Sequence, residues 1–303
     1  EIFPSKSETW IHHEIDELRR MGCEVRVFAT HPPPSNVAIE LKYLLELTTY
    51  LTEQPKRLGP ALRTLFNSGL LLPVAKEFFT DTPTFRFKAQ VLRDLFYSGL
   101  FFPHVQDFAP DILFAHFAGT RTNLALFHSL LSGKPFAFKM HAADVFARVA
   151  ILRLKCKRAA WIGTISEFNI EFMKKANPEI DFSGLAIHKC GLPLDKFAYN
   201  PKSAMSEPRL LVSVGRMVRT KGFDVLIKAS HELKRRGLHH NVLIVGDGPQ
   251  RPELERLVDS LELYDTVRLP GYRSPREVQA ALAEADAFVL PVGWDPILHI
   301  PEG

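Results

Sequence analysis

Short apolar runs alternate with amphipathic helical segments along most of this 303-residue chain, and this alternation constrains the fold more than any other feature. The apolar runs have the length of buried strands and lie at 112–115, 135–139, 160–165, 210–214, 242–245, 267–269 and 287–291. The segments with helical periodicity lie at 122–132, from Glu167 onward, and at 221–236, 250–260 and 275–284. Strands that alternate with helices form parallel sheets covered by helices. The sequence therefore predicts an α/β protein with two doubly wound, Rossmann-like parallel-sheet domains.

The boundary between the two domains is expected in the loop-like stretch DKFAYNPKSAMSEPR, which begins at Asp195. We predict an N-terminal domain at residues 1–200 and a C-terminal domain at residues 201–303. Ligands of open parallel sheets bind at the carboxyl ends of the strands. Two sheets that face each other therefore predict an interdomain cleft.

A helical insert rich in Leu and Phe is predicted over about residues 39–102. One interpretation is that its helices pack on the first domain. The other is an amphipathic surface for a membrane or a lipid-linked molecule, with Lys56, Arg57 and Arg63 facing anionic headgroups.

The stretch LLVSVGRMVRTKG, residues 210–222, combines a buried strand, a glycine turn and two cations. Gly215 allows a sharp turn, Arg216 and Lys221 follow, and Thr220 is expected to cap the next helix. A helix N-terminus and two cations form a favourable place for a diphosphate. The alternative is a strand-to-helix connection with two solvated surface cations.

Other phosphate-binding and metal-binding motifs are not found. Lys221 lies between Thr220 and Gly222, which does not fit a P-loop. The pair Gly246 and Gly248 lacks the third glycine of a dinucleotide fingerprint. No Asp-x-Asp triplet occurs, so we expect the two cations, and no metal ion or other cofactor, to hold a diphosphate.

Two histidines directly follow predicted strands, at the carboxyl ends where ligand-binding residues belong. His141 comes after the strand at 135–139, and His116 comes after the strand at 112–115. A lone histidine is usually structural, so a packing role is the alternative for each. Asp144 could orient His141, and His116 is either a cleft wall or an acceptor contact.

Composition narrows the class of partner and the compartment. The net charge is only +4, which gives a nucleic-acid partner no support. Three cysteines without metal-ligand spacing indicate structural thiols in a reducing compartment. No run of about 18 apolar residues occurs, so a cytoplasmic protein is expected. The basic cluster at 153–158, including Lys155, is interpreted as a solvated helix face. The alternative is contact with an anionic acceptor or with the inner face of the membrane.

The stretch VGRMVRTKGFDVLIKA resembles the diphosphate-binding loop of glycosyltransferase family 4, the retaining sugar transferases of the GT-B fold. FPSKSETWIHHEIDELRRMGCEV resembles the opening of members that build bacterial exopolysaccharides, such as the colanic-acid type. AHFAGTRTNLA, FKMHAADVF, TISEFN, KCGLPLDKF, VLIVGDGPQRPELE and VRLPGYRSPREV resemble further landmarks of this subfamily, in the same order along nearly the whole chain.

The resemblance implies roles for individual residues. Gly215, Arg216 and Lys221 would meet the donor diphosphate, and the turn 271–273 (Gly271, Tyr272 and Arg273) would meet the nucleobase. His141 would contact the donor sugar. Glu302 matches the first of two family glutamates seven residues apart, which touches the donor sugar; the alternative is a fraying terminus. The second glutamate would lie beyond Gly303, so we expect a chain truncated at its end, and at its start as well.

The function implied by the resemblance is a retaining, metal-independent hexosyltransferase. Its donor would be a UDP- or GDP-sugar, and its acceptor a saccharide or lipid-linked oligosaccharide in surface polysaccharide biosynthesis. Two alternatives stay open: a sugar-nucleotide epimerase or phosphorylase of the same fold, and a non-catalytic nucleotide- or glycan-binding scaffold.

Overall fold

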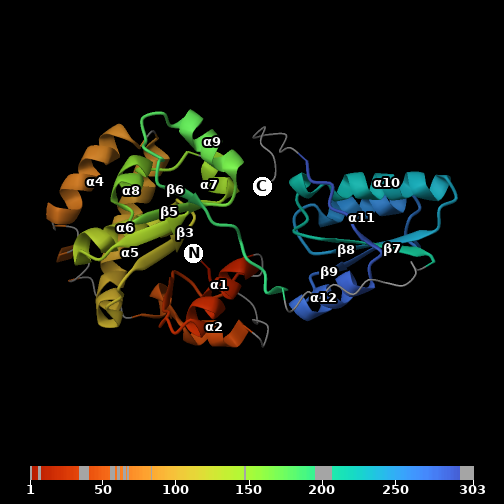
Figure 1. Ribbon diagram of the computed structural model, residues 1–303, viewed down its shortest axis with the longest axis horizontal. Helices are drawn as coiled ribbons and strands as arrows, with labels where there is room; N and C mark the ends of the chain where they lie inside the picture. Colours follow the sequence, from red (N-terminus) through yellow and green to blue (C-terminus); the bar gives the residue numbers. More distant parts are fainter. Residues whose placement is uncertain are drawn as a thin grey trace. The chain divides into compact units, whose positions relative to one another are not determined.

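The computed structural model describes residues 2–293, except for 6–7, 34–40, 55–58, 60–61, 64–65, 67, 83, 147 and 195–206. The chain divides into two compact units, unit 1 at residues 1–191 and unit 2 at residues 192–303 (Figure 1). The predicted boundary after residue 200 falls within the undescribed segment 195–206 and stays a prediction. So does the predicted interdomain cleft.

The main sheet of unit 1 is four-stranded and parallel, in the order β3-β4-β5-β6. Its strands are β3 (Leu113–His116), β4 (Phe136–Lys139), β5 (Trp161–Thr164) and β6 (Leu185–Ile187). Its helices are α6 (Thr120–Ser132), α7 (Ala142–Phe146), α8 (Leu152–Arg158) and α9 (Glu167–Ala176). The strands expected near 112–115, 135–139 and 160–165 are confirmed, and β6 is an addition to them.

One face of this sheet forms the main core of unit 1. Phe136, Phe138 and Ile162 alternate along β4 and β5 on the same face, and they belong to one buried cluster with Leu126 and Leu154 from α6 and α8. These residues favour strands because alternate side chains of a strand point to the same side of the sheet, so that the apolar ones can all face the core. The carboxyl ends of β3 and β4 are thereby fixed next to each other.

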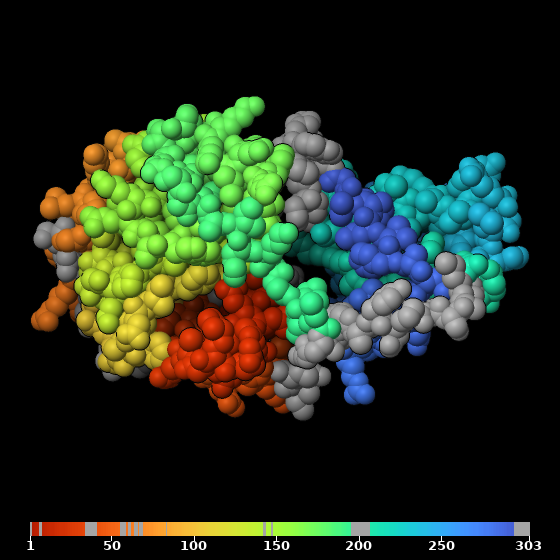
Figure 2. Space-filling view, viewed as in Figure 1, coloured from red at the N-terminus to blue at the C-terminus, as the bar shows by residue number. Residues whose placement is uncertain are grey.

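The N-terminal segment forms a smaller body with its own core, in which Ile11, Ile15, Leu44 and Tyr50 are buried. It contains α1 (Thr9–Arg20), β1 (Val27–Ala29), α2 (Lys42–Glu46), β2 (Thr48–Tyr50) and the 3-10 helix η2 (Leu51–Glu53). Figure 2 shows this segment, in red, packed against the yellow and green remainder of unit 1.

The prediction of a helical insert over 39–102 is wrong at 48–50, because β2 is a strand there and pairs in parallel with β1. β2 consists of two threonines and a tyrosine, which favour extended backbone. Most of the remaining described residues of the insert are helical: α4 (Ser68–Thr80) and α5 (Phe85–Phe108) follow, and the Thr84 hydroxyl caps α5 by accepting the Phe87 N–H. Among the described residues, no helix combines the length and apolar character needed to cross a bilayer.

Unit 2 has a four-stranded parallel sheet in the order β10-β7-β8-β9. Its strands are β7 (Arg209–Val214), β8 (His240–Val245), β9 (Val267–Gly271) and β10 (Ala287–Phe288). Its helices are η4 (Arg219–Lys221), α10 (Phe223–Arg235), α11 (Arg251–Ser260) and α12 (Pro275–Glu284). The core joins strand residues such as Val242 and Ile244 to Phe223, Ile227 and Leu254 on the helices. The strand-helix alternation expected for this half is confirmed.

Candidate functional site

His141 lies at the carboxyl end of β4 and its side chain is nearly inaccessible, with 7% of the residue exposed. Its Nε2 is buried and has no hydrogen-bond partner among the described residues. Asp144 does not orient the ring as expected. Its Oδ2 instead accepts a hydrogen bond from the His141 backbone N–H at 3.1 Å, because the chain turns into α7 there. Asp144 therefore holds the backbone that carries the imidazole.

His116 ends β3 and is paired in register with Lys139 on β4. Its ring centroid lies 5.9 Å from that of His141, so the structure brings the two predicted histidines together. The Nε2 atom of His116 is 3.7 Å from Oε2 of Glu14, on α1. The Nδ1 atom is buried and without a hydrogen-bond partner in the described part of the chain.

Aromatic side chains complete this cluster, which we call the histidine cluster: Trp10, Glu14, His116, Phe117, Lys139 and His141. The ring of Trp10, on α1, has its centroid 4.7 Å from that of His116 and 4.3 Å from that of His141. Lys139 Nζ lies 5.4 Å from the centroid of the Trp10 ring. Trp10 and Glu14 were not predicted as site residues. Their spacing of four places them on one helix face, and that spacing is the signal that could have found them.

The loop after β3 has a strained backbone at Phe117, whose φ is 68°. A non-glycine residue takes this left-handed conformation only at an energetic cost. Phe117 is held by two hydrogen bonds: its N–H donates to Lys139 O at 2.8 Å, and its carbonyl accepts from Thr122 Oγ1 at 2.6 Å. Its ring centroid lies 4.7 Å from that of His141. This left-handed backbone conformation thus holds the Phe117 ring next to the His141 imidazole.

The two imidazoles are neutral at neutral pH. Burial lowers the pKa of His116 to about 3, and the charges of His141, Lys139 and His188 act in the same direction. Burial lowers the pKa of His141 to about 4, assisted by Lys139 and Arg121. Burial raises the pKa of Glu14, whereas the charges of Lys139 and His188 oppose that shift. Neutral imidazole offers one donor and one acceptor nitrogen, which suits hydroxyl groups.

The interpretation of the basic cluster at 153–158 as a solvated helix face is wrong for Lys155, which is fully buried. Its Nζ donates to the carbonyl oxygens of Ala118 at 2.5 Å and Ala150 at 2.8 Å. Lys157 and Arg158 on the same helix are exposed, as expected. Apolar spacing alone could not reveal this, because a lysine is almost never buried without specific partners.

In unit 2, the residues predicted for a diphosphate follow β7 on one loop. Arg216 is exposed and Lys221 is half-buried, with its aliphatic stem against Gly215. The expected cap by Thr220 is wrong: Gly222 is the N-cap of α10, with φ of 65°, and no side chain caps the helix. A β-carbon at Gly222 would lie 1.9 Å from the carbonyl oxygen of Pro291, so the close approach requires glycine.

Two further loops meet this one at the same edge of the sheet. Gly246, after β8, has φ of 142°, and a β-carbon there would lie 1.9 Å from the carbonyl oxygen of Gly215. The Gly246 N–H donates to the carbonyl of Gly271, at the end of β9, at 3.0 Å. Tyr272 and Arg273 are exposed beside it. The predicted diphosphate and nucleobase residues are therefore brought together in unit 2, whereas Glu302 lies outside the described residues.

Arg251, on α11, is a residue of this edge that the sequence did not indicate. Its Nη2 donates to the carbonyl of Leu269 at 2.9 Å, and its Nη1 is 3.0 Å from the position of a β-carbon on Gly271. Its Nε donates to Glu255 at 2.7 Å. Arg251 thus braces the end of β9 from the neighbouring helix.

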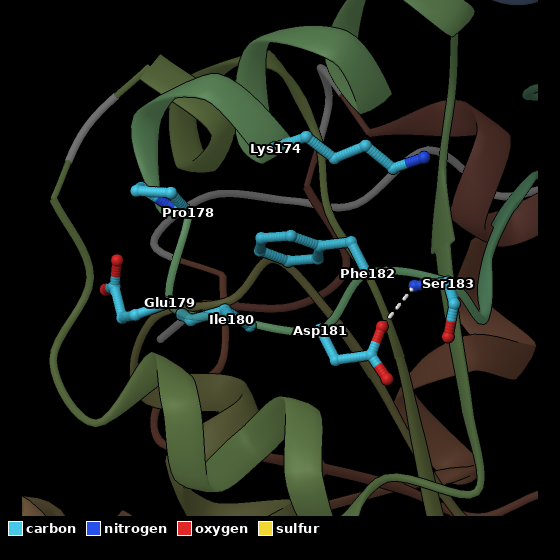
Figure 3. A pocket seen from close by; sticks show the side chains of 7 residues that line it. All are labelled: Lys174, Pro178, Glu179, Ile180, Asp181, Phe182 and Ser183. Atoms are coloured by element: carbon cyan, nitrogen blue, oxygen red, sulfur yellow. Dashed lines mark hydrogen bonds between the residues drawn. The ribbon is translucent and has the colours of Figure 1, made fainter.

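Within the described residues, no group of three or more His, Cys, Asp or Glu side chains is arranged to hold a metal ion. A hollow of about 540 Å³ lies between the end of α9 and the turn at 178–183 (Figure 3). Lys174 and Phe182 line it, and the Asp181 carboxylate there accepts the Ser183 N–H at 2.9 Å. None of the predicted site residues lines it.

Solved structures show the class of fold. The structure of the HepE protein of Anabaena in complex with UDP and glucose superposes with a TM-score of 0.60 at 17% identity, covering 97% of this chain and 72% of that one. Together with the two parallel-sheet units, this confirms the expected GT-B glycosyltransferase fold.

Sequence comparison shows which proteins the chain resembles. Residues 195–300 match the family model described as glycosyl transferases group 1. The chain is 27% identical over 300 residues to the putative colanic acid biosynthesis glycosyltransferase WcaL of Escherichia coli, covering 95% of this chain and 73% of that protein. It is 26% identical over 305 residues to the amylovoran biosynthesis glycosyltransferase AmsK of Erwinia amylovora, with the same shares. The resemblance to family-4 glycosyltransferases of the colanic-acid type is confirmed.

Proposed function

We propose that this glycosyltransferase acts in exopolysaccharide biosynthesis as a retaining, metal-independent hexosyltransferase. The donor is a nucleotide-sugar, and the acceptor is a saccharide or a lipid-linked oligosaccharide. The observation that carries the proposal is the convergence in unit 2 of the loops after β7, β8 and β9, joined by the contacts of Gly215, Gly246 and Gly271. That edge of a parallel sheet is where nucleotides bind.

The proposed chemistry uses Arg216 and Lys221 on the leaving nucleoside diphosphate. Negative charge grows on the diphosphate as the bond from the sugar to its oxygen breaks. Fixed cations and the N-terminus of α10 stabilise that charge more in the transition state than in the ground state. The acceptor oxygen forms its bond to the anomeric carbon on the face that the phosphate leaves, and the acceptor proton passes to an oxygen of the leaving phosphate, so the anomeric configuration is retained. No metal ion is required for this step.

Unit 1 supplies the proposed sugar contacts. The buried Nε2 of His141, which has no hydrogen-bond partner within the described part of the chain, suits a hydroxyl of the donor hexose. The pair of His116 and Glu14 suits a hydroxyl of the acceptor, because a carboxylate accepts the hydrogen bond that such a hydroxyl donates. Glu302 is assigned to the donor sugar by its resemblance to the family motif alone.

A panel of nucleotide-sugars tests the proposal. Because the HepE structure contains UDP and glucose, UDP-sugars are the first donors to examine, followed by GDP-sugars. The protein is incubated with each donor and lipid-linked saccharides, with and without EDTA, and the anomeric configuration of the product is read by NMR. We expect EDTA-resistant transfer with retention. Inversion or EDTA sensitivity would contradict the mechanism, epimerised donor would favour the alternative enzyme, and binding without turnover would favour a scaffold.

A further inference from the structure

A buried lysine lies directly behind the histidine cluster and takes no part in the chemistry proposed above. The Nζ of Lys155, on α8, donates hydrogen bonds to two backbone carbonyls, those of Ala118 and Ala150. Ala118 belongs to the loop that follows β3 and comes two residues after His116. Burial of an ammonium group is costly without such partners, so the contacts are specific.

Asp144 contacts the same loop at the N–H of Ala118, whereas Lys155 contacts its carbonyl. Its carboxylate accepts the N–H of Ala118 as well as the N–H of His141. Asp144 and Lys155 also attract each other electrostatically. These two oppositely charged side chains therefore hold Ala118 at both its N–H and its carbonyl, and Asp144 also holds the start of the turn that carries His141.

We propose that Lys155 and Asp144 are positioning residues, which cross-link the loops after β3 and β4 and so set the arrangement of His116, Phe117 and His141. The left-handed backbone of Phe117 requires such support, because strain of this kind persists only where surrounding contacts impose it. Neither residue touches the sugar. The effect on turnover rests on the function proposed above, but the effect on imidazole geometry does not.

Two charged residues that only stabilise the fold lead to a different expectation from two residues that position the loops. Replacing a buried pair by neutral groups of similar volume often keeps or improves stability. The double variant Lys155→Met with Asp144→Asn avoids leaving one buried charge alone, so we expect it to fold. The bond from Nζ to Ala118 is nevertheless lost, and the loop after β3 is expected to shift. A displacement near 1 Å costs on the order of 100-fold in rate.

The test compares Lys155→Met, Asp144→Asn and the double variant with Lys157→Met, an identical substitution at an exposed position of the same helix. Histidine ring resonances are recorded by NMR, with His239 of unit 2 as an internal reference. Turnover, donor KM and affinity for UDP are measured in parallel. We expect shifted His116 and His141 resonances and a turnover loss of about 10- to 100-fold in the double variant, with UDP affinity unchanged and Lys157→Met like the parent.

Unshifted His116 and His141 resonances in a folded double variant would overturn the inference, whatever the activity. So would full turnover in that variant. If the resonances shift in the double variant but the parent protein itself transfers no sugar, only the proposed function is contradicted. If the single variants fail to fold, the double variant alone decides, since it carries no unpaired charge. If it also fails to fold while Lys157→Met folds, the pair is a stability element and the inference is wrong.

Discussion

Single buried histidines make unit 1 sensitive to acid. His128 is 4% exposed, its ring stacks on Phe102 with centroids 5.9 Å apart, and burial lowers its pKa to about 4. In the unfolded chain a histidine has its ordinary pKa near 6.5. Between these two values the unfolded state binds more protons than the folded state. The stability that neutral His128 preserves is therefore present above pH 6.5 and lost as the pH falls through 4.

Replacement of His128 by Gln tests whether this histidine lowers the stability of the fold as the pH falls. The shift of about 2.5 units corresponds to at most about 3 kcal/mol of stability lost between pH 6.5 and 4. We expect the free energy of unfolding of His128→Gln to be lower at pH 7 but to fall less steeply below pH 6.5. Urea unfolding monitored at several pH values measures it. Parallel pH profiles of the two proteins would contradict the prediction.

At the donor loop, the two cations are expected to act on one group of oxygen atoms. Lys221→Ala should weaken UDP binding, and Arg216→Lys should weaken it too, because an ammonium cannot reproduce the bidentate fork. Their losses should not add up, since they share a ligand. Titration calorimetry with UDP measures both, and Lys228→Ala, an exposed lysine of α10, is the control. Unchanged affinity in both loop variants would contradict the donor site.

His141→Ala should behave differently from the loop variants. Free UDP contains no sugar hexose for the imidazole to contact, so we expect UDP affinity to be kept while turnover falls. The same calorimetric series measures this. A loss of UDP affinity equal to that of Lys221→Ala would argue against a sugar contact.

At the scale of elements, the loops of unit 2 pack backbone on backbone. Gly246→Ala would place a β-carbon 1.9 Å from the carbonyl of Gly215, at a φ of 142°. We expect a loss of more than about 1–3 kcal/mol of stability together with a loss of UDP binding, because the donor loop must move. Gly237→Ala is a matched control: its φ is 73°, but nothing lies within 4 Å of the new β-carbon. It should cost about 1–2 kcal/mol and keep UDP affinity.

The insert helices present both a packed and an exposed face. Leu70 and Val74 of α4 are buried in the core of unit 1, whereas Leu72 and Phe79 are 73% and 74% exposed. Packing thus accounts for part of this helix and leaves the membrane interpretation for its outer face. Lys56 and Arg57 lie outside the described residues, and Arg63 is exposed.

Vesicle sedimentation tests the outer face of α4. If it docks on a membrane, the protein should co-sediment with anionic vesicles and be released by salt. The variant Leu72→Ser with Phe79→Ser should sediment less. Tyr264→Ser, at a residue of unit 2 that is 75% exposed, should sediment like the parent. Equal sedimentation of all three proteins would leave packing as the only role of the insert.

At the scale of the whole molecule, two separate cores predict that ligand binding stabilises the units unequally. The predicted diphosphate and nucleobase residues belong to unit 2, whose core is built around Phe223, Ile227 and Ile244. A ligand stabilises the state that binds it by RT ln(1 + [L]/Kd). We expect UDP to slow hydrogen exchange in peptides from β7 to β9 and to leave the core strands β4 and β5 unchanged. Protection confined to β4 and β5 would contradict the assignment.

The amino-acid sequence by itself determined the features that depend on neighbouring residues. Apolar runs and helical spacing predicted the strands of the unit 2 sheet and β3, β4 and β5 of unit 1, and glycine with two cations marked the loop at 215–221. Strand ends identified His116 and His141. Each of these signals is local, because a strand, a turn or a helix face is written in residues a few positions apart.

Only the tertiary structure decided which residues and elements that are distant in sequence contact one another. It paired β1 with β2, turned Trp10 and Glu14 of α1 toward the two histidines, and buried Lys155 against the carbonyl of Ala118. Periodicity shows that a helix has two faces, but the partner of each face depends on packing between segments that are distant in sequence. A lysine next to three other basic residues therefore reads as solvated, and only the carbonyls and carboxylates that fold around it make its burial possible.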